Sequence, residues 1–292
     1  MGWSATVFCL FDFLRLWKSA TRPGAGSVAT DFVNVAFVVV GIVLTEVWGA
    51  DPLTILASWS LGLTIGVGIL LSSIRSGLRL GVRGIFDSHA FTFGLQGLLG
   101  SGSVQIANFL IGAVQSTQIL GALRGGTTFS GPSNLVTSTV QSAAIRPFAK
   151  TTPGSKERNS SLLKWLLVSS STSIPVLVVA GLVAYLYGGE LLGETWVVTA
   201  PVLIWILADA AMVSFSGPAH AAHRADLKSR RVLAISITVG LLRMSLVPFG
   251  AVVAGATGAA IIFFGLSMVS GLLLWASYFH YARAVPRGRH SL

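Results

Sequence analysis

The chain has 292 residues, of which 53% are hydrophobic and 10% are charged, whereas an ordinary soluble domain carries roughly 25% charged residues. Its net charge of +10 does not indicate nucleic acid, because the basic residues lie in short segments between long apolar runs. A single cysteine, Cys9, excludes a disulfide framework and a multi-cysteine metal site, and the scarcity of charge excludes an ordinary soluble fold.

Residues 1–27 are predicted to form a cytoplasmic or interfacial N-terminal segment. Met1–Trp17 carries Asp12 and Arg15, and it lacks the basic start and the small-residue cleavage site of a signal peptide. Its apolar stretch Val7–Phe11 is too short to cross a bilayer, since a transmembrane helix needs about 20 residues.

Eight apolar runs follow, each long enough to cross a bilayer as a helix. They cover residues 28–48, 53–75, 92–113, 117–147, 162–187, 198–219, 230–252 and 256–281. The sequence therefore predicts an all-α fold, a polytopic bundle of eight transmembrane helices. The predicted divisions after the N-terminal segment are two helices (28–75), a cytoplasmic linker (76–91), a six-helix domain (92–281) and a basic cytoplasmic tail (282–292).

Lysine and arginine occur in alternate loops. They precede the first run, follow the second, fourth and sixth runs, and follow the eighth. The intervening loops, which contain neither residue, lie near Asp51, Ser116, Glu190–Glu194 and Val253–Gly255. Because basic loops stay on the cytoplasmic side, the sequence predicts a multi-pass membrane protein with both termini in the cytoplasm.

Polar residues recur along one face of the third and of the fourth run. In the third run the face consists of Ser101, Gln105, Asn108 and Gly112. In the fourth it consists of Arg124, Thr127, Gly131, Asn134, Ser138 and Gln141. Steps of three and four residues place each set on one side of a helix. Hydrogen bonds between helices would explain such faces, but two consecutive polar helices favour a water-accessible cavity.

The fourth and fifth helices are expected to be broken. Gly125, Gly126, Gly131 and Pro132 lie inside the fourth run, and Pro175 lies inside the fifth. Proline removes a backbone donor, and glycine lowers the cost of bending. Broken backbone at membrane depth is tolerated only beside protein or a cavity.

Three charged residues, Arg124, Asp209 and Arg243, lie deep inside the runs, away from their ends. Asp209 and Arg243 fall at similar depth in the sixth and seventh runs, where pairing would lower the cost of burying either one. The pair is either structural or a coupling or gating site, unless the two residues never meet. Arg124 lies about 10 Å from its helix start. It either binds phosphate or an acidic sugar or extends outward to the interface.

Enzyme and metal motifs are absent. The sequence contains no Walker loop, no HExxH and no GxSxG motif, and its carboxylates are not spaced as a catalytic pair. We therefore expect no enzyme, no catalytic residue, no bound metal and no cofactor. His220 and His223 are interpreted as loop residues rather than as metal ligands.

The sequence contains several small-residue and loop segments of a distinctive kind, namely Gly121–Gly126 with Gly131–Asn134 and Arg146–Pro147, Leu191–Trp196, Ala254–Ala260, and Phe11–Trp17 followed by Asp31. These segments resemble bacterial polysaccharide exporters and lipid-linked oligosaccharide (O-antigen) flippases, in the superfamily that includes multidrug antiporters. Family members usually have two six-helix lobes around a central cavity. The resemblance implies one complete lobe (92–281), part of a second (28–75), and a loss of about four N-terminal helices.

The resemblance also implies a function and a location. The protein would move polyprenyl-pyrophosphate-linked glycan units across the bacterial cytoplasmic membrane by alternating access. Its partners would be membrane lipid, the lipid-linked glycan, and a glycan polymerase or glycosyltransferases, with no nucleic acid. The substrate-binding candidates are Arg124, Gln105, Asn108, Asn134, Gln141 and Arg243. Two alternatives stay open: a cation-coupled multidrug antiporter of the same fold, and a non-transporting scaffold subunit of glycan assembly.

Overall fold

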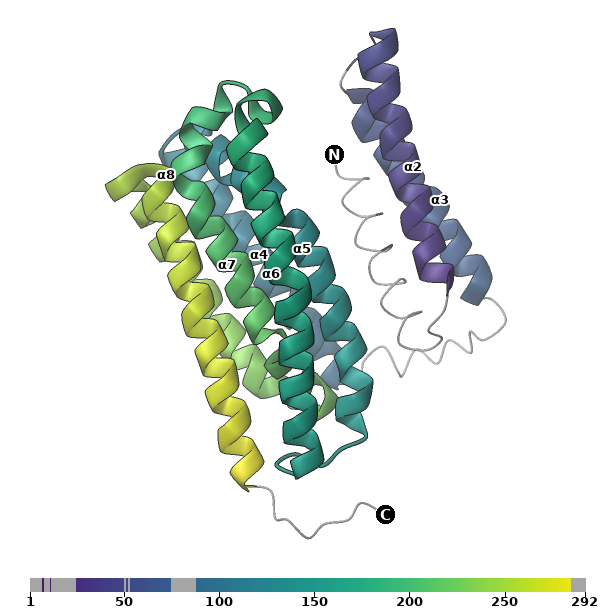
Figure 1. Cartoon of the computed structure of the whole chain (residues 1–292), viewed down its shortest axis with the longest axis vertical. Helices are drawn as coiled ribbons and strands as arrows, with labels where there is room; N and C mark the ends of the chain where they lie inside the picture. Colours follow the sequence, from purple (N-terminus) through teal and green to yellow (C-terminus); the bar gives the residue numbers. More distant parts are fainter. Residues whose placement is uncertain are drawn as a thin grey trace. The chain divides into compact units, whose positions relative to one another are not determined.

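The computed structural model describes residues 7, 11, 25–49, 51, 53–74 and 88–284, and these residues form helices without a strand. The helices are α2 (Ala25–Trp48), α3 (Leu53–Ile74), α4 (Ser88–Val114), α5 (Thr117–Ala149), α6 (Lys156–Leu192), α7 (Thr195–Ala225) and α8 (Ser229–Ala284) (Figure 1). Most of the predicted N-terminal segment, the linker and the C-terminal tail lie outside the described residues. The chain divides into two compact units, Met1–Gly84 and Ile85–Leu292.

Seven of the eight apolar runs lie wholly within a helix, and the second lies within α3 except for residue 75, which is outside the described residues. The last two runs share α8. This 56-residue helix is two helices joined across a bend, where Gly255 has a φ of 61° that glycine adopts without strain. The Arg243 guanidinium on one side of the bend donates to Ser267 Oγ on the other (2.8 Å). The two halves of α8 therefore lie antiparallel as a hairpin.

Within the described part of the chain, three helical segments are long and apolar enough to cross a membrane: Lys156–Leu192, Thr195–Ala225 and Arg230–Ala284. Shorter apolar segments occur in other helices, such as Gly102–Val114 in α4. The all-α class is thus confirmed for the described residues. That all eight runs cross the membrane, in one complete lobe and part of a second, stays a prediction.

Within the unit Ile85–Leu292, α5 packs on α6 and α7, while α8 packs on α7 and α4. An apolar core joins α4, α5, α7 and α8. Its buried residues are Ala107, Ile111, Ala122, Leu123, Val202, Ile206, Val239, Val247, Ala251, Ala259, Ala260 and Leu266. Burial of this shared core fixes the helices that carry the candidate site.

The expected helix breaks are not seen as interruptions. α5 continues from Thr117 to Ala149 through Pro132, and α6 continues from Lys156 to Leu192 through Pro175. One proline removes one backbone donor, which the remaining hydrogen bonds of a long helix tolerate. Two of the α5 glycines instead allow close packing. A Cβ on Gly125 would lie 2.7 Å from Thr199 Oγ1, and one on Gly126 would overlap Ile206.

The unit Met1–Gly84 contains α2 packed on α3. A Cβ on Gly62 of α3 would lie 2.9 Å from Phe37 Cβ of α2, so this glycine permits a close approach. Phe11, Leu63 and Leu70 belong to a small apolar cluster of this unit.

Candidate functional site

The exposed face of α5 is polar along its length. Arg124, Thr127, Asn134 and Ser138 are all exposed. Of the large hydrophobic residues of α5, which is described throughout, only Leu135 is exposed. Lipid cannot hydrogen-bond to such side chains, so this face requires water, protein or a polar ligand.

α4 contributes a second polar face on the side next to α5. Gln105 is exposed and Asn108 is half-buried, while the side chain of Ser101 lies outside the described part. A Cβ on Gly112, which shares their face, would lie 3.6 Å from Leu120 Cδ2 of α5. Leu120 precedes Arg124 by four residues and therefore lies on the polar side of α5. The two faces thus approach each other beside the turn at Ser116, whose hydroxyl caps α5.

We call this surface the α4–α5 polar face. It comprises Gln105, Asn108, Gly112, Arg124, Thr127, Gly131, Asn134 and Ser138. Gln141 lies at its edge, because a Cβ on Gly217 of α7 would lie 2.8 Å from Gln141 Nε2.

Partners differ among the side chains of this face. The Thr127 hydroxyl donates to Arg124 O (2.8 Å), and the Ser138 hydroxyl donates to Leu135 O (2.9 Å). These bonds to the preceding turn satisfy the hydroxyl protons. By contrast, the side chains of Gln105, Arg124 and Asn134 form no hydrogen bond or ion pair with any described residue. Two neutral amides and a guanidinium are therefore free to bind a polar ligand.

Asp209 and Arg243 lie near each other, with Ser267 in contact with both. Arg243 donates to Ser267 Oγ (2.8 Å), and Asp209 interacts with the Ser267 hydroxyl and with the Arg243 charge. Asp209 Oδ1 and Arg243 Nε have no hydrogen-bond partner among the described residues. The structure therefore brings the two charges together between α7 and α8. Ser267 was not foreseen from the sequence.

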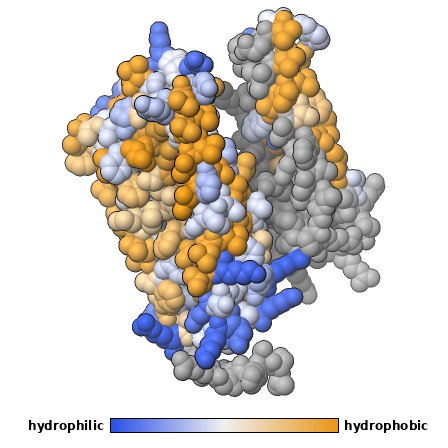
Figure 2. Space-filling view, viewed as in Figure 1, coloured by the Kyte–Doolittle hydropathy of each residue, from blue (hydrophilic) through white to orange (hydrophobic). Residues whose placement is uncertain are grey.

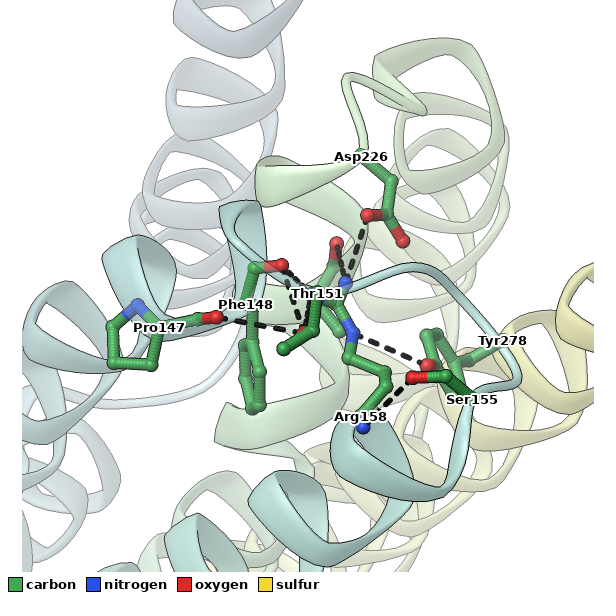
Figure 3. A network of polar contacts seen from close by, with 8 residues as sticks. Pro147, Phe148, Thr151, Ser155, Arg158, Asp226 and Tyr278 are labelled. Atoms are coloured by element: carbon green, nitrogen blue, oxygen red, sulfur yellow. Dashed lines mark hydrogen bonds and ion pairs between the residues drawn. The ribbon is translucent and has the colours of Figure 1, made fainter. Parts of the chain in front are cut away.

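Arg158 is the centre of a buried network at the end of the bundle where α6 begins (Figure 3). Its side chain is fully buried and donates to Asp226 Oδ1 (2.8 Å), Ala222 O (3.3 Å) and Tyr278 Oη (3.3 Å), as well as to Phe148 O. The guanidinium carbon lies 4.6 Å from the centre of the Phe148 ring. Burial raises the pKa of the Asp226 carboxyl, and the nearby guanidinium opposes that rise.

This network, the Arg158 clamp, joins the ends of α5, α6, α7 and α8. Sequence reasoning placed Arg158 among the loop cations and missed the clamp. Its partners lie 10, 64, 68 and 120 residues away along the chain, so no local spacing signals them. A buried cation is stable only when it is paired and hydrogen-bonded, as Arg158 is.

The interpretation of His220 and His223 as loop residues is wrong. Both lie in α7, which continues beyond the apolar run because small buried residues such as Ala221 and Ala222 let it pack closely. His223 Nε2 lies 3.2 Å from Leu274 O of α8. The side-chain amide of Gln96 in α4 donates to His220 Nε2 (2.5 Å). In the part of the chain that the structure describes, no three His, Cys, Asp or Glu side chains gather as a metal site.

Sequence reasoning also missed a group of hydroxyls shared by three helices. Thr137 of α5 lies within hydrogen-bond distance of Ser173 of α6 (3.1 Å) and of Ser214 of α7. All three residues are buried. These bonds hold the non-exposed side of α5 against its neighbours and leave the polar face outward.

Comparison with known proteins gives one match. A family model described as "polysaccharide biosynthesis protein" matches residues 28–201, more than half of the chain. The matched region includes the whole α4–α5 polar face. No curated protein and no solved structure matches the chain.

Proposed function

Because the chain belongs to the polysaccharide biosynthesis protein family, we propose that it is a flippase-type membrane transporter of polysaccharide precursors. Its substrate is a polyprenyl-pyrophosphate-linked oligosaccharide, which it moves across the cytoplasmic membrane by alternating access. The protein carries out this movement without a chemical step and without a cofactor. Its partners are the lipid-linked glycan and the enzymes that make or polymerise it.

The observation that carries the proposal is the α4–α5 polar face. Gln105 and Asn134 offer amide donors and acceptors to sugar hydroxyls, and the Arg124 guanidinium offers a charge-assisted contact to phosphate or a carboxylated sugar. A glycan crossing a membrane needs such partners, because unsatisfied polar groups are costly in hydrocarbon.

The charge of the same face favours an anionic substrate over a cationic drug. Neither α4 nor α5 contains an aspartate or a glutamate, whereas Arg124 supplies a positive charge. A cavity that binds cations would need a carboxylate at this surface. Asp209, the carboxylate inside the sixth apolar run, lies between α7 and α8 and interacts with Arg243.

The orientation follows from the charges at the two ends of the bundle. Hydrophilic side chains gather at the lower end of the bundle in Figure 2. The α5–α6 and α7–α8 turns lie at this basic end, with Arg146, Lys150, Lys156, Arg230 and Arg231. The turn between α4 and α5 contains no lysine or arginine. We place the basic end on the cytoplasmic side, which puts Arg124 nearer the outer surface.

Restoration of surface glycan in a flippase-deficient strain tests the proposal. We expect the chain to restore glycan export and Arg124→Gln to lower the export rate at least tenfold, because a charge-assisted contact is lost. Arg283→Gln is the matched control, since Arg283 is exposed at the basic end, and it is expected to export at the parental rate. A well-expressed chain that never restores surface glycan would overturn the transporter and favour a scaffold. Parental export by Arg124→Gln would exclude Arg124 from the substrate path.

A further inference from the structure

The turn between α7 and α8 contains a leucine in an unusual conformation. Leu227 has a φ of 53°, in the left-handed region that a leucine rarely adopts. Its amide donates to Arg224 O (3.1 Å), and the Lys228 amide donates to His223 O (2.9 Å). These two bonds close the end of α7 in an arrangement that usually has glycine at the position of Leu227. The turn therefore contains a strained leucine where glycine would be free of strain.

Leu227 is also 56% exposed, at the basic end of the bundle. Cations follow it in the chain, namely Lys228, Arg230 and Arg231. At a membrane surface, an apolar side chain enters the headgroup region while neighbouring cations stay beside the lipid phosphates. A strained, exposed leucine next to cations therefore indicates contact with lipid rather than with water.

Two of these cations lie against one aromatic ring, that of Tyr281 near the end of α8. Lys228 Nζ lies 4.7 Å from the ring centre, and Arg231 Cζ lies 5.3 Å from it. A cation–π contact attracts each cation to the ring. It leaves N–H groups of both side chains available, because an ammonium has three donors and a guanidinium has five. The ring therefore gathers two positive charges that would otherwise move apart.

These two cations lack an acidic partner. Neither Lys228 nor Arg231, nor the Tyr281 hydroxyl, forms a hydrogen bond or an ion pair with any residue that the structure describes. Asp226, the acid of the turn, is attracted by the Lys228 charge, but its Oδ1 pairs with Arg158 (2.8 Å) and its side chain is only 7% exposed. The Arg158 clamp therefore uses this negative charge, and the surface around Tyr281 stays positive.

We propose that Lys228, Arg231 and Tyr281 bind the phosphate of an anionic phospholipid, with Leu227 in contact with the glycerol and acyl region of the same lipid. The two cations donate charge-assisted hydrogen bonds to the phosphate oxygens, and the Tyr281 hydroxyl supplies another donor. The apolar contact of Leu227 favours a lipid over soluble phosphate. These residues lie outside the α4–α5 polar face, and lipid binding to them does not depend on the proposed transport.

Lipid titration followed by native mass spectrometry tests this site. The full chain in detergent micelles is titrated with phosphatidylglycerol, which is anionic, and separately with phosphatidylcholine, which has a phosphate but no net charge. The affinity for the first bound lipid is measured in each case. We expect phosphatidylglycerol to bind at least tenfold more tightly, because the two cations have no acidic partner in the described part of the chain.

Substitution of the two cations should weaken this binding. We expect Lys228→Gln with Arg231→Gln to lower the affinity for phosphatidylglycerol at least fivefold, because both charge-assisted contacts are lost. Lys150→Gln with Arg283→Gln is the matched control. It removes one lysine and one arginine, both exposed, from the same end of the bundle, and it should keep the parental affinity. Millimolar inorganic phosphate should leave the bound lipid in place, since phosphate lacks the apolar contact.

Two further variants separate lipid binding from folding. Tyr281→Leu keeps both charges but removes the ring, and it should lower the affinity for phosphatidylglycerol at least twofold. Leu227→Gly relieves the strained φ, so the Tm of the lipid-free protein should rise. The same change should lower the lipid affinity at least twofold, whereas a purely structural leucine would raise the Tm alone.

Four results would overturn the site. Equal affinity for the two lipids would show that negative charge is not recognised. An equal loss in the control variant would mean that the total charge of the basic end attracts the lipid. Displacement by inorganic phosphate would make phosphate alone the ligand. Parental affinity in both Tyr281→Leu and Leu227→Gly would remove the lipid from this turn.

Discussion

α5 and α6 are neighbouring helices of 33 and 37 residues that expose opposite chemistry. α5 exposes polar side chains with one large apolar exception. α6 exposes large apolar side chains along most of its length, namely Leu163, Leu167, Ile174, Val178, Val179, Leu182, Val183, Tyr185, Leu186, Tyr187 and Leu191. Lipid solvates the second face and not the first. Exposure alone therefore does not identify a lipid-facing helix; the kind of side chain exposed does.

The largest effect is expected at the Arg158 clamp, which fixes the two faces relative to each other. Arg158→Ala leaves Asp226 buried without its cation, so we expect a loss of about 3–5 kcal/mol of unfolding free energy. Lys164→Ala, an exposed change in the same helix, should alter it by less than about 0.5 kcal/mol. Denaturant unfolding in micelles measures both. Equal, small effects would show that the clamp does not hold the helix ends.

A matched pair of mid-helix substitutions tests directly whether α5 and α6 have different surroundings. Asn134 and Ile174 are both exposed and lie near the centres of α5 and α6. Ile174→Asp places a carboxylate in lipid, at a cost of about 2.5–3.5 kcal/mol, and should sharply reduce the yield of folded protein in membranes. Asn134→Asp should give nearly the parental yield. Equal damage from the two changes would mean that α5 also faces lipid.

Two glycines of α5 have different surroundings: Gly125 lies on the packed side of the helix, and Gly131 lies on the open side. Gly125→Ala brings a Cβ within 2.7 Å of Thr199 Oγ1, so we expect a destabilisation of about 1–3 kcal/mol. Nothing lies within 4 Å of a Cβ on Gly131, so Gly131→Ala should stabilise the helix by up to about 1 kcal/mol. Thermal unfolding of both variants in micelles distinguishes them. A reversed order would show that the packed side of α5 has been misassigned.

The smallest effect is expected between α7 and α8. Asp209→Asn and Arg243→Leu, made singly and together, should give a coupling energy of about 0.5–1 kcal/mol. The value is small because the Arg243 hydrogen bond goes to Ser267. Unfolding free energies of the four proteins measure it. If the effects of the two single substitutions add up to the effect of the double substitution, Asp209 and Arg243 are not energetically coupled.

The positions of the helices were predictable because apolar runs of about 20 residues have few other stable arrangements. The two polar faces were also predictable, since steps of three and four residues fix a helix face whatever surrounds it. α5 and α6 continue through the expected break points, and a bend at these residues stays a prediction. Glycine and proline affect how easily a helix bends, whereas the packing of neighbouring helices decides whether it does. Gly125 and Gly126 meet Thr199 and Ile206 of α7, contacts that no local pattern contains.

The polar contacts between helices that are distant along the chain could not be predicted from the sequence. Arg158 looks like any other loop cation until Phe148, Asp226 and Tyr278 surround it. Gln96 and His220 are 124 residues apart, and their link depends on how α4 and α7 approach across α8. The sequence contains the residues of these networks, but their partners are determined only by the fold.

The central claim is that the polar face of α5 meets water or a polar ligand while α6 meets lipid. Asn134→Cys and Ile174→Cys, each in the Cys9→Ser background, test this claim in nanodiscs with a water-soluble maleimide. We predict that position 134 reacts at least tenfold faster than position 174. Equally slow reaction at both positions would contradict the account, because both helices would then be surrounded by hydrocarbon.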